Sequence, residues 1–289
     1  MNGPVIVVHG GAGAYGSELQ ERAAEYREAL ISALMAGAAR IDAGAGAVEA
    51  VCAAVIAMED FPLFNAGHGA ALCADGSVEL SASAMRGSDQ AAGAVALVRR
   101  TRNPVAAAIS MLGQPEVLLA GEQADAFAAA RGLEQCEPSE FVTERQRRRL
   151  AACVSGEGAT VGAVCLDAAG LLAAATSTGG LHGQRPGRVG DSPVIGAGTW
   201  ADRLVAVSCT GKGEAFVRAG AARLLAAQVA SGVALQTAAG AVLDAVAECE
   251  GDGGLIAIDA HGEFVLPFST DAMPRGVWRG GKDPVVEIP

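Results

Sequence analysis

Residues 158–180, GATVGAVCLDAAGLLAAATSTGG, constrain the fold of this chain more than any other stretch. They contain two apolar runs, 160–166 and 171–176, separated by the turn 167–170. A short loop with glycine in its last position suits a β-hairpin, because glycine accepts the left-handed backbone conformation. Strands that are apolar almost throughout are buried on both faces of a sheet. The stretch therefore predicts a hairpin inside the core.

Folding the two runs about this turn brings Thr160 close to Thr178 at the open end of the hairpin. Cross-strand threonine pairs commonly stabilise sheets, so a structural role stays open. A threonine hydroxyl becomes a good nucleophile only beside a base, and an N-terminal threonine carries its own, because an α-amino group has a pKa of about 8. Such a terminus requires a cut between Ala159 and Thr160. The residues before Thr160 are small or flexible, which would let its hydroxyl reach the Ala159 carbonyl.

Composition excludes several classes of protein. The chain has 289 residues, enough for one large or two small domains, and a net charge of −11 that argues against nucleic acid and anionic membrane surfaces. No apolar run approaches the roughly 20 residues that span a bilayer. The chain starts without a basic leader and apolar segment, so we expect a cytoplasmic protein. Seven scattered cysteines and four distant histidines indicate neither a disulfide framework nor a zinc site.

The remaining patterns predict an α+β protein, a four-layer αββα sandwich with two antiparallel-rich sheets between helices. A charged stretch at about 134–159 reads as a linker, and its arginines at 145 and 147–149 read as a solvated helix face. The glycine-rich turn after His9 lacks a phosphate-binding pattern, so its backbone is expected to pass close to another segment. The expected strands are 5–8, 93–98, 116–120, 204–209, 255–259 and 263–268; the expected helices are 18–39, 44–58, one opening at Pro104, 122–130, 212–230 and 233–248.

Other polar groups gather near predicted strand ends. Thr210 and Gly211 follow an apolar run, and Arg188 and Asp191 lie in an irregular loop. Each has a structural alternative. Thr210 could cap the next helix, and Arg188 could simply pair with Asp191.

Seven motifs occur in an order that resembles the plant-type L-asparaginases, also called isoaspartyl peptidases, which are N-terminal-nucleophile hydrolases. They are HGGAG at 9–13, PLFNAGHGA at 62–70, TVGAV at 160–164, TSTGG at 176–180, GRVGDSP at 187–193, SCTGKGE at 208–214 and GGLIAID at 253–259. The resemblance covers nearly the whole chain. It implies self-cleavage into an α subunit (1–159) and a β subunit (160–289) that fold as one domain, and a homodimer of such αβ units.

The resemblance also implies roles for individual residues. Thr160 would be the nucleophile, with its new amine as the base, and Thr178 would hold and polarise it. Arg188 would bind the substrate α-carboxylate, a task that suits its planar guanidinium, and Asp191 the α-ammonium. The remaining implied contacts are the oxyanion hole of Thr210 and the Gly211 N–H, substrate contact at Gly213, and support of the nucleophile by Asn65.

The expected substrates are β-aspartyl dipeptides and L-asparagine, with no required cofactor. A structural Na⁺ would bind backbone carbonyls of Met58, Glu59, Phe61, Phe64, Ala66 and His68.

Departures from the family pattern are Ala159 before the cut, Ser81, Arg86, Lys212 and Ser269. Two alternatives stay open: a glycosylasparaginase-like amidohydrolase, and an uncleaved non-catalytic member that binds amino acids or dipeptides. TSTGG and SCTGKGE favour the asparaginase branch.

Overall fold

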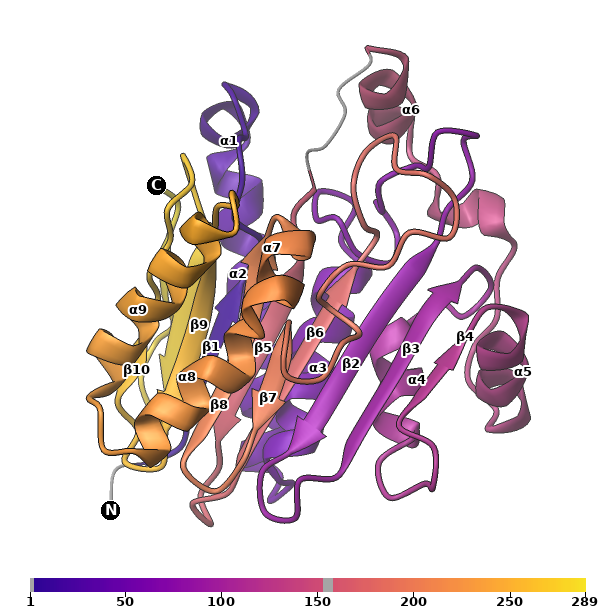
Figure 1. Ribbon diagram of the computed structural model, residues 1–289. Coiled ribbons are helices and arrows are strands. Elements are labelled where there is room, and N and C mark those ends of the chain that lie inside the picture. Colours follow the sequence, from indigo (N-terminus) through magenta and orange to yellow (C-terminus); the bar gives the residue numbers. More distant parts are fainter. Residues whose placement is uncertain (1–2, 153–157) are drawn as a thin grey trace.

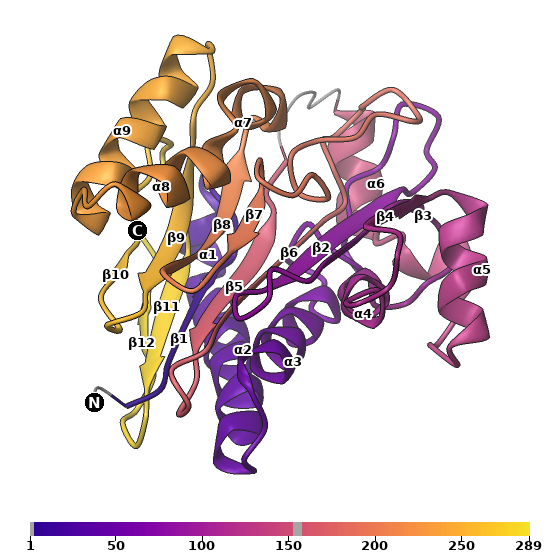
Figure 2. The same cartoon turned by 60° about the horizontal axis from the view of Figure 1, so that its bottom comes forward.

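The computed structural model describes residues 3–152 and 158–289. Figures 1 and 2 show two stacked sheets with helices on both outer faces, which confirms the predicted four-layer α+β sandwich. The larger sheet has the strand order β12-β11-β1-β5-β6-β2-β3-β4, and the smaller has the order β10-β9-β8-β7.

The larger sheet consists of β1 (Val5–His9), β2 (Leu80–Arg86), β3 (Ala92–Val98), β4 (Leu118–Ala120), β5 (Val161–Leu166), β6 (Leu172–Thr178), β11 (Arg275–Arg279) and β12 (Val285–Glu287). The smaller sheet consists of β7 (Thr199–Ala201), β8 (Val205–Gly211), β9 (Gly253–Asp259) and β10 (Phe264–Val265). The helices are α1 (Glu18–Glu21), α2 (Ala23–Asp42), α3 (Ala47–Glu59), α4 (Pro104–Ser110), α5 (Glu122–Ala130), α6 (Glu144–Ala151), α7 (Gly213–Ala219), α8 (Ala221–Ala230) and α9 (Leu235–Glu248), with a 3₁₀ turn η1 at Pro138–Phe141.

Strand alternation separates three hydrophobic cores. Along β1, Ile6 and Val8 point into the core beneath α2 and α3, whereas Val5 and Val7 point between the two sheets. The third core lies between the smaller sheet and helices α7 to α9. A strand with apolar residues on both faces must lie between two layers, and β1 and β5 satisfy this requirement.

The predicted hairpin is confirmed and lies near the middle of the larger sheet. β5 pairs antiparallel with β6 in the register Val161↔Ser177 to Leu166↔Leu172. β1 flanks the hairpin on one side and β2 on the other. Thr160 immediately precedes β5 and Thr178 ends β6, so both threonines lie at the same end of these two central strands.

Several elements differ from the sequence prediction. Four strands were not predicted, namely β2, β7, β11 and β12; β2 is rich in serine and alanine, and β7 and β12 have three residues each. The predicted helix 18–39 is interrupted at Arg22, and the predicted helix 212–230 is interrupted at Gly220. Residues 74–77 form a turn, and the residues flanking it form no strands before Leu80.

Much of the predicted linker is structured. It contains η1 and α6, whereas its residues 153–157 lie outside the described part of the chain. The solvated-face prediction holds for Arg147 and Arg148 but is wrong for Arg145 and Arg149, which pack against Glu18. Within residues 3–152 and 158–289, each helix is too short or too polar to cross a lipid bilayer. The six cysteines in these ranges are all free.

Candidate active site

Three hydroxyl groups surround Thr160 at the open end of the hairpin. Its Oγ1 lies 3.2 Å from Thr178 Oγ1 and 3.4 Å from Ser192 Oγ, and its backbone N–H donates to Thr210 Oγ1 at 3.3 Å. All four residues are buried. The structure therefore brings together three residues that the sequence placed at strand ends, and adds Ser192, which the sequence analysis missed.

Thr210 has a hydroxyl hydrogen to spare. Its Oγ1 accepts hydrogen bonds from the backbone N–H groups of Ala12 and Thr160, at 3.0 and 3.3 Å. Two acceptor positions are thereby used, and the single O–H can point elsewhere. Thr210 lies inside β8, and the residue that precedes helix α7 is Lys212, so the helix-capping alternative for Thr210 is wrong.

Asn65 fixes the loop that follows Thr178. Its side-chain N–H donates to the Gly180 carbonyl at 2.6 Å, and its backbone carbonyl accepts from the Gly179 N–H at 2.9 Å. Its Oδ1 accepts from the Ala71 N–H at 2.6 Å. The Gly180 N–H in turn donates to Thr178 Oγ1 at 3.0 Å. Asn65 thus acts on Thr160 through Thr178 rather than by direct contact.

Arg188 and Asp191 lie next to one another but do not form the simple pair that was left open. The Arg188 guanidinium donates two hydrogen bonds to the Glu214 carboxylate, at 2.9 and 2.8 Å. This fork shows that Arg188 is oriented to receive a carboxylate. A Cβ on Gly213 would lie 2.8 Å from Asp191 Oδ1 and 2.9 Å from Arg188 Nη2, so glycine lets the α7 terminus approach both groups.

Asp191 is a buried acid with unused hydrogen-bonding capacity. Its side chain is 3% exposed, and its Oδ2 has no hydrogen-bond partner among the described residues. Burial raises the pKa of Asp191 to about 7, although nearby Arg188 acts in the opposite direction. A carboxylate kept from water without a full set of partners is a favourable place for an added cation.

A cavity of about 460 Å³ ends against the segment that precedes Thr160. Asn65, Gly158, Ala159 and Gly211 line it, whereas Thr160 does not. Gly11 has φ +109°, and a Cβ there would lie 2.2 Å from Ala159 Cβ. The glycine-rich turn therefore passes close to another segment, as predicted, and that segment is the one before Thr160.

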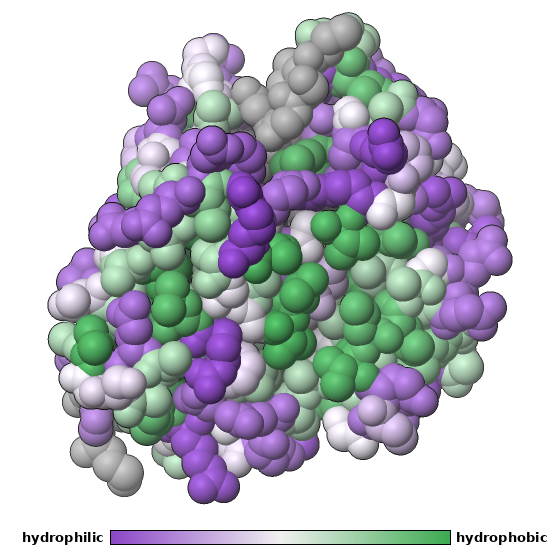
Figure 3. Space-filling view, in the orientation of Figure 1, coloured by the Kyte–Doolittle hydropathy of each residue, from purple (hydrophilic) through white to green (hydrophobic). Residues whose placement is uncertain are grey.

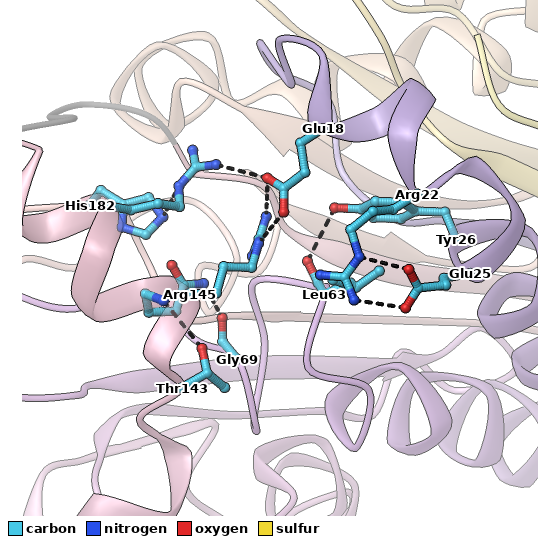
Figure 4. A network of polar contacts seen from close by, with 11 residues as sticks. Glu18, Arg22, Glu25, Tyr26, Leu63, Gly69, Thr143, Arg145 and His182 are labelled. Atoms are coloured by element: carbon cyan, nitrogen blue, oxygen red, sulfur yellow. Dashed lines mark hydrogen bonds and ion pairs between the residues drawn. The ribbon is translucent and has the colours of Figure 1, made fainter.

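Helix α6 forms one wall of this cavity, and an ion-pair cluster holds it (Figure 4). Arg145 donates to both carboxylate oxygens of Glu18 on α1, at 2.5 and 2.9 Å, and Arg149 also reaches Glu18 at 3.4 Å. Arg149 Nε lies 3.1 Å from His182 Nε2. Burial, aided by the two arginines, lowers the pKa of His182 to about 4, so the ring is neutral and accepts this bond.

The predicted carbonyl loop is compact. The Glu59 carbonyl accepts from the His68 N–H at 2.7 Å, and the Met58 and Phe61 carbonyls accept from Phe61 and Phe64 N–H at 3.2 Å each. The Glu59 side chain is fully buried, and its Oε2 lacks a hydrogen-bond partner in the described structure. Across residues 3–152 and 158–289, His, Cys, Asp and Glu side chains form no cluster of three that could hold a metal.

Comparison with known proteins places the chain in a family. The asparaginase family (Asparaginase_2) matches residues 2–288. The isoaspartyl peptidase of Escherichia coli K12 is 43% identical over 311 residues, covering 100% of this chain and 97% of that protein. The isoaspartyl peptidase/L-asparaginase proteins of Bos taurus and Homo sapiens are 40% and 39% identical over 294 residues, covering 97% of this chain and 94% of each. The chain belongs to the asparaginase family, which confirms the resemblance inferred from the motifs.

Proposed function

We infer that the protein is an isoaspartyl peptidase with L-asparaginase activity. Its substrates would be β-aspartyl dipeptides and L-asparagine, which yield L-aspartate and an amine or ammonia. Full-length relatives with these names support the activity. The observation that carries the chemistry is the contact of Thr160 with Thr178 through its hydroxyl and with Thr210 through its backbone nitrogen.

The first step would be a cut between Ala159 and Thr160, giving α (1–159) and β (160–289) subunits. The Thr160 hydroxyl attacks the Ala159 carbonyl, the acyl group moves from nitrogen to oxygen, and water hydrolyses the ester. The freed Thr160 amine can then accept a proton, which a backbone amide cannot do. The intact chain would also block its own site, because Ala159 lines the cavity whereas Thr160 does not. Removal of residues from this segment would extend the cavity to Thr160.

In the mature enzyme, the Thr160 hydroxyl would attack the substrate β-carbonyl while its amine takes the proton. The Thr210 hydroxyl, with its spare hydrogen, and the Gly211 N–H would stabilise the oxyanion; loss of one such donor typically costs about 3 kcal/mol in the barrier. The leaving amine of the substrate, or ammonia from L-asparagine, departs with the proton that the Thr160 amine had taken. Water then hydrolyses the β-aspartyl ester on Thr160. Thr178 holds the nucleophile throughout, and Asn65 holds the loop behind Thr178.

Substrate selection would rest on two charges. The α-carboxylate would take the place of the Glu214 carboxylate on the Arg188 fork. The α-ammonium would bind Asp191, whose Oδ2 lacks a partner, and Gly213 would border both contacts. A substrate that carries both charges at one carbon would fit, and the β-carbonyl would then extend toward Thr160.

The αβ units would assemble as a homodimer. In Figures 1 and 2 the smaller sheet covers only part of the larger one and leaves β3 and β4 beyond its edge. Figure 3 shows apolar residues gathered over this side of the molecule. Leu118, which begins β4, is 47% exposed. An apolar sheet face of this kind favours burial against a second copy.

The test compares wild-type protein with Thr160→Ala on β-aspartyl dipeptides and L-asparagine. We expect two bands on a denaturing gel and release of aspartate for the wild type, and one band and no release for the variant. An active variant would remove Thr160 from its role. A folded, intact wild-type protein that binds dipeptides without turnover would instead establish the non-catalytic alternative.

A further inference from the structure

A line of buried hydroxyl groups crosses from β1 to the substrate loop between the two sheets. The line starts at His9 Nε2, which lies 2.9 Å from Ser208 Oγ, and Ser208 Oγ lies 2.7 Å from Thr176 Oγ1. Thr199 Oγ1 follows at 2.5 Å from Thr176, and Ser83 Oγ at 2.7 Å from Thr199. Ser83 Oγ ends the line 2.5 Å from the Ser192 carbonyl. Each of these five side chains is fully buried.

The hydroxyl groups at the Ser192 end of the line donate toward its middle. Ser83 Oγ donates to Thr199 Oγ1 and to the Ser192 carbonyl, and Thr199 Oγ1 donates to Thr176 Oγ1. The contact between Thr176 and Ser208 can take either hydroxyl as its donor. Ser83 has one hydrogen for its two acceptors, so it ties the Ser192 backbone to the rest of the line.

His9 ends this line as a neutral ring. Burial lowers the pKa of His9 to about 3, and the Thr160 backbone beside the ring offsets this only in part. A neutral ring carries one N–H, and His9 Nδ1 has no hydrogen-bond partner among the described residues. Gly162 on β5 makes room for the first link, because a Cβ there would lie 1.9 Å from Ser208 Oγ and 2.5 Å from His9 Nε2.

We propose that His9, Ser208, Thr176, Thr199 and Ser83 form a buried hydrogen-bond network that positions the substrate loop against the proposed nucleophile, Thr160. The network fixes the Ser192 backbone, and with it the Ser192 hydroxyl that lies 3.4 Å from Thr160 Oγ1 and the preceding residue, Asp191. These five residues touch no reacting atom and act as positioning residues. The effect on turnover rests on the proposed function, whereas the network itself does not.

The kinetic test breaks the network in the middle. Thr176→Val keeps the shape of the side chain and removes the hydroxyl, and we expect kcat/KM for a β-aspartyl dipeptide to fall about 10- to 100-fold, because a small misplacement of reacting groups has effects of this size. Ser83→Ala should act alike, and Thr176→Ser should restore most of the activity.

Thr101→Val is the matched control. Thr101 is also fully buried and loses one hydroxyl bond, to Asp125 at 2.7 Å, but it belongs to neither the network nor the site. We expect it to lower the melting temperature as much as Thr176→Val does while kcat/KM stays unchanged. If Thr176→Val and Thr101→Val lower the melting temperature by similar amounts and also have equal kcat/KM, the positioning role is wrong.

The network itself is tested by nitrogen NMR of the histidine rings in folded protein, with the His9 signals identified by their loss in His9→Gln. We expect Thr176→Val to shift the His9 Nε2 signal, because Ser208 connects the two side chains, and Thr101→Val to leave it unchanged. An Nε2 signal that Thr176→Val does not move would contradict the network. This measurement reports on the network even if the protein shows no hydrolysis, so the two proposals can fail separately.

Discussion

Asp191 is the residue at which stability and the proposed function oppose one another most clearly. Its pKa is raised from the ordinary value of 3.8 to about 7, chiefly by burial. Between these two values the folded protein holds a proton that the unfolded chain lacks, so the contribution of this group to stability falls as pH rises from about 4 to about 7. Above pH 7 the buried carboxylate is ionised without a full set of partners, unless a substrate ammonium binds.

Asp191→Asn tests this balance. Asparagine cannot ionise, so the variant should melt at a higher temperature than wild type at pH 8, with a smaller difference at pH 4. Its kcat/KM for L-asparagine should fall about 10- to 100-fold, because hydrogen bonds to charged groups contribute about 1.5–3 kcal/mol. In the wild type, KM should fall as pH rises through about 7. A variant that melts lower at pH 8 and keeps full activity would show that Asp191 is a structural acid.

At the same scale, the sequence predicts the site only where local pattern determines geometry. The hairpin register follows from the turn at 167–170, so the meeting of Thr160 and Thr178 was predictable. Ser192 was not, because its distance to Thr160 depends on how an irregular loop returns to the sheet. The hydroxyls of the buried network come from separate segments of the sequence, and nothing local relates them.

Among the elements, α6 shows why charge pattern alone misplaces a segment. Residues 144–151 read as a solvated linker, yet Arg145 is held by Glu18 from α1, and the Gln146 side chain donates to the Gly69 carbonyl. A helix with charged residues on both faces can still bury one face through ion pairs. The ion-pair partner of Arg145, Glu18, lies 127 residues away in sequence. Short strands such as β7 were not predicted for a related reason. They form because they pair with a neighbouring strand, and three residues are too few to show a strand pattern.

The loop at 58–68 carries the element-scale prediction, that a sodium ion binds its carbonyls. Burial raises the pKa of Glu59 to about 8, and its Oε2 is unpartnered in the described structure. A cation in the loop would favour the ionised carboxylate and lower that pKa. Replacing sodium with choline at equal ionic strength should therefore lower the melting temperature, more at pH 9 than at pH 6. Identical melting curves in the two salts would exclude the ion.

For the whole molecule, we propose that the enzyme is built in a blocked form. Three cores stabilise the sandwich, and the hairpin between β1 and β2 places Thr160, the proposed nucleophile, at the end of the central strands. Ala159 lines the cavity beside it, whereas Thr160 does not. The layers, the central hairpin and the family could be predicted from the sequence. Helix α6, before the proposed cleavage site, and its packing against Glu18 could be described only from the tertiary structure.

Mass spectrometry of aged, active protein tests the central claim most directly. Under denaturing conditions we expect two chains, one of which begins Thr-Val-Gly-Ala at Thr160, and under native conditions the mass of two αβ units. Thr160→Ala should remain a single chain. An active preparation that consists only of intact chains of 289 residues would contradict the account, because Thr160 would then have no amine to accept its proton.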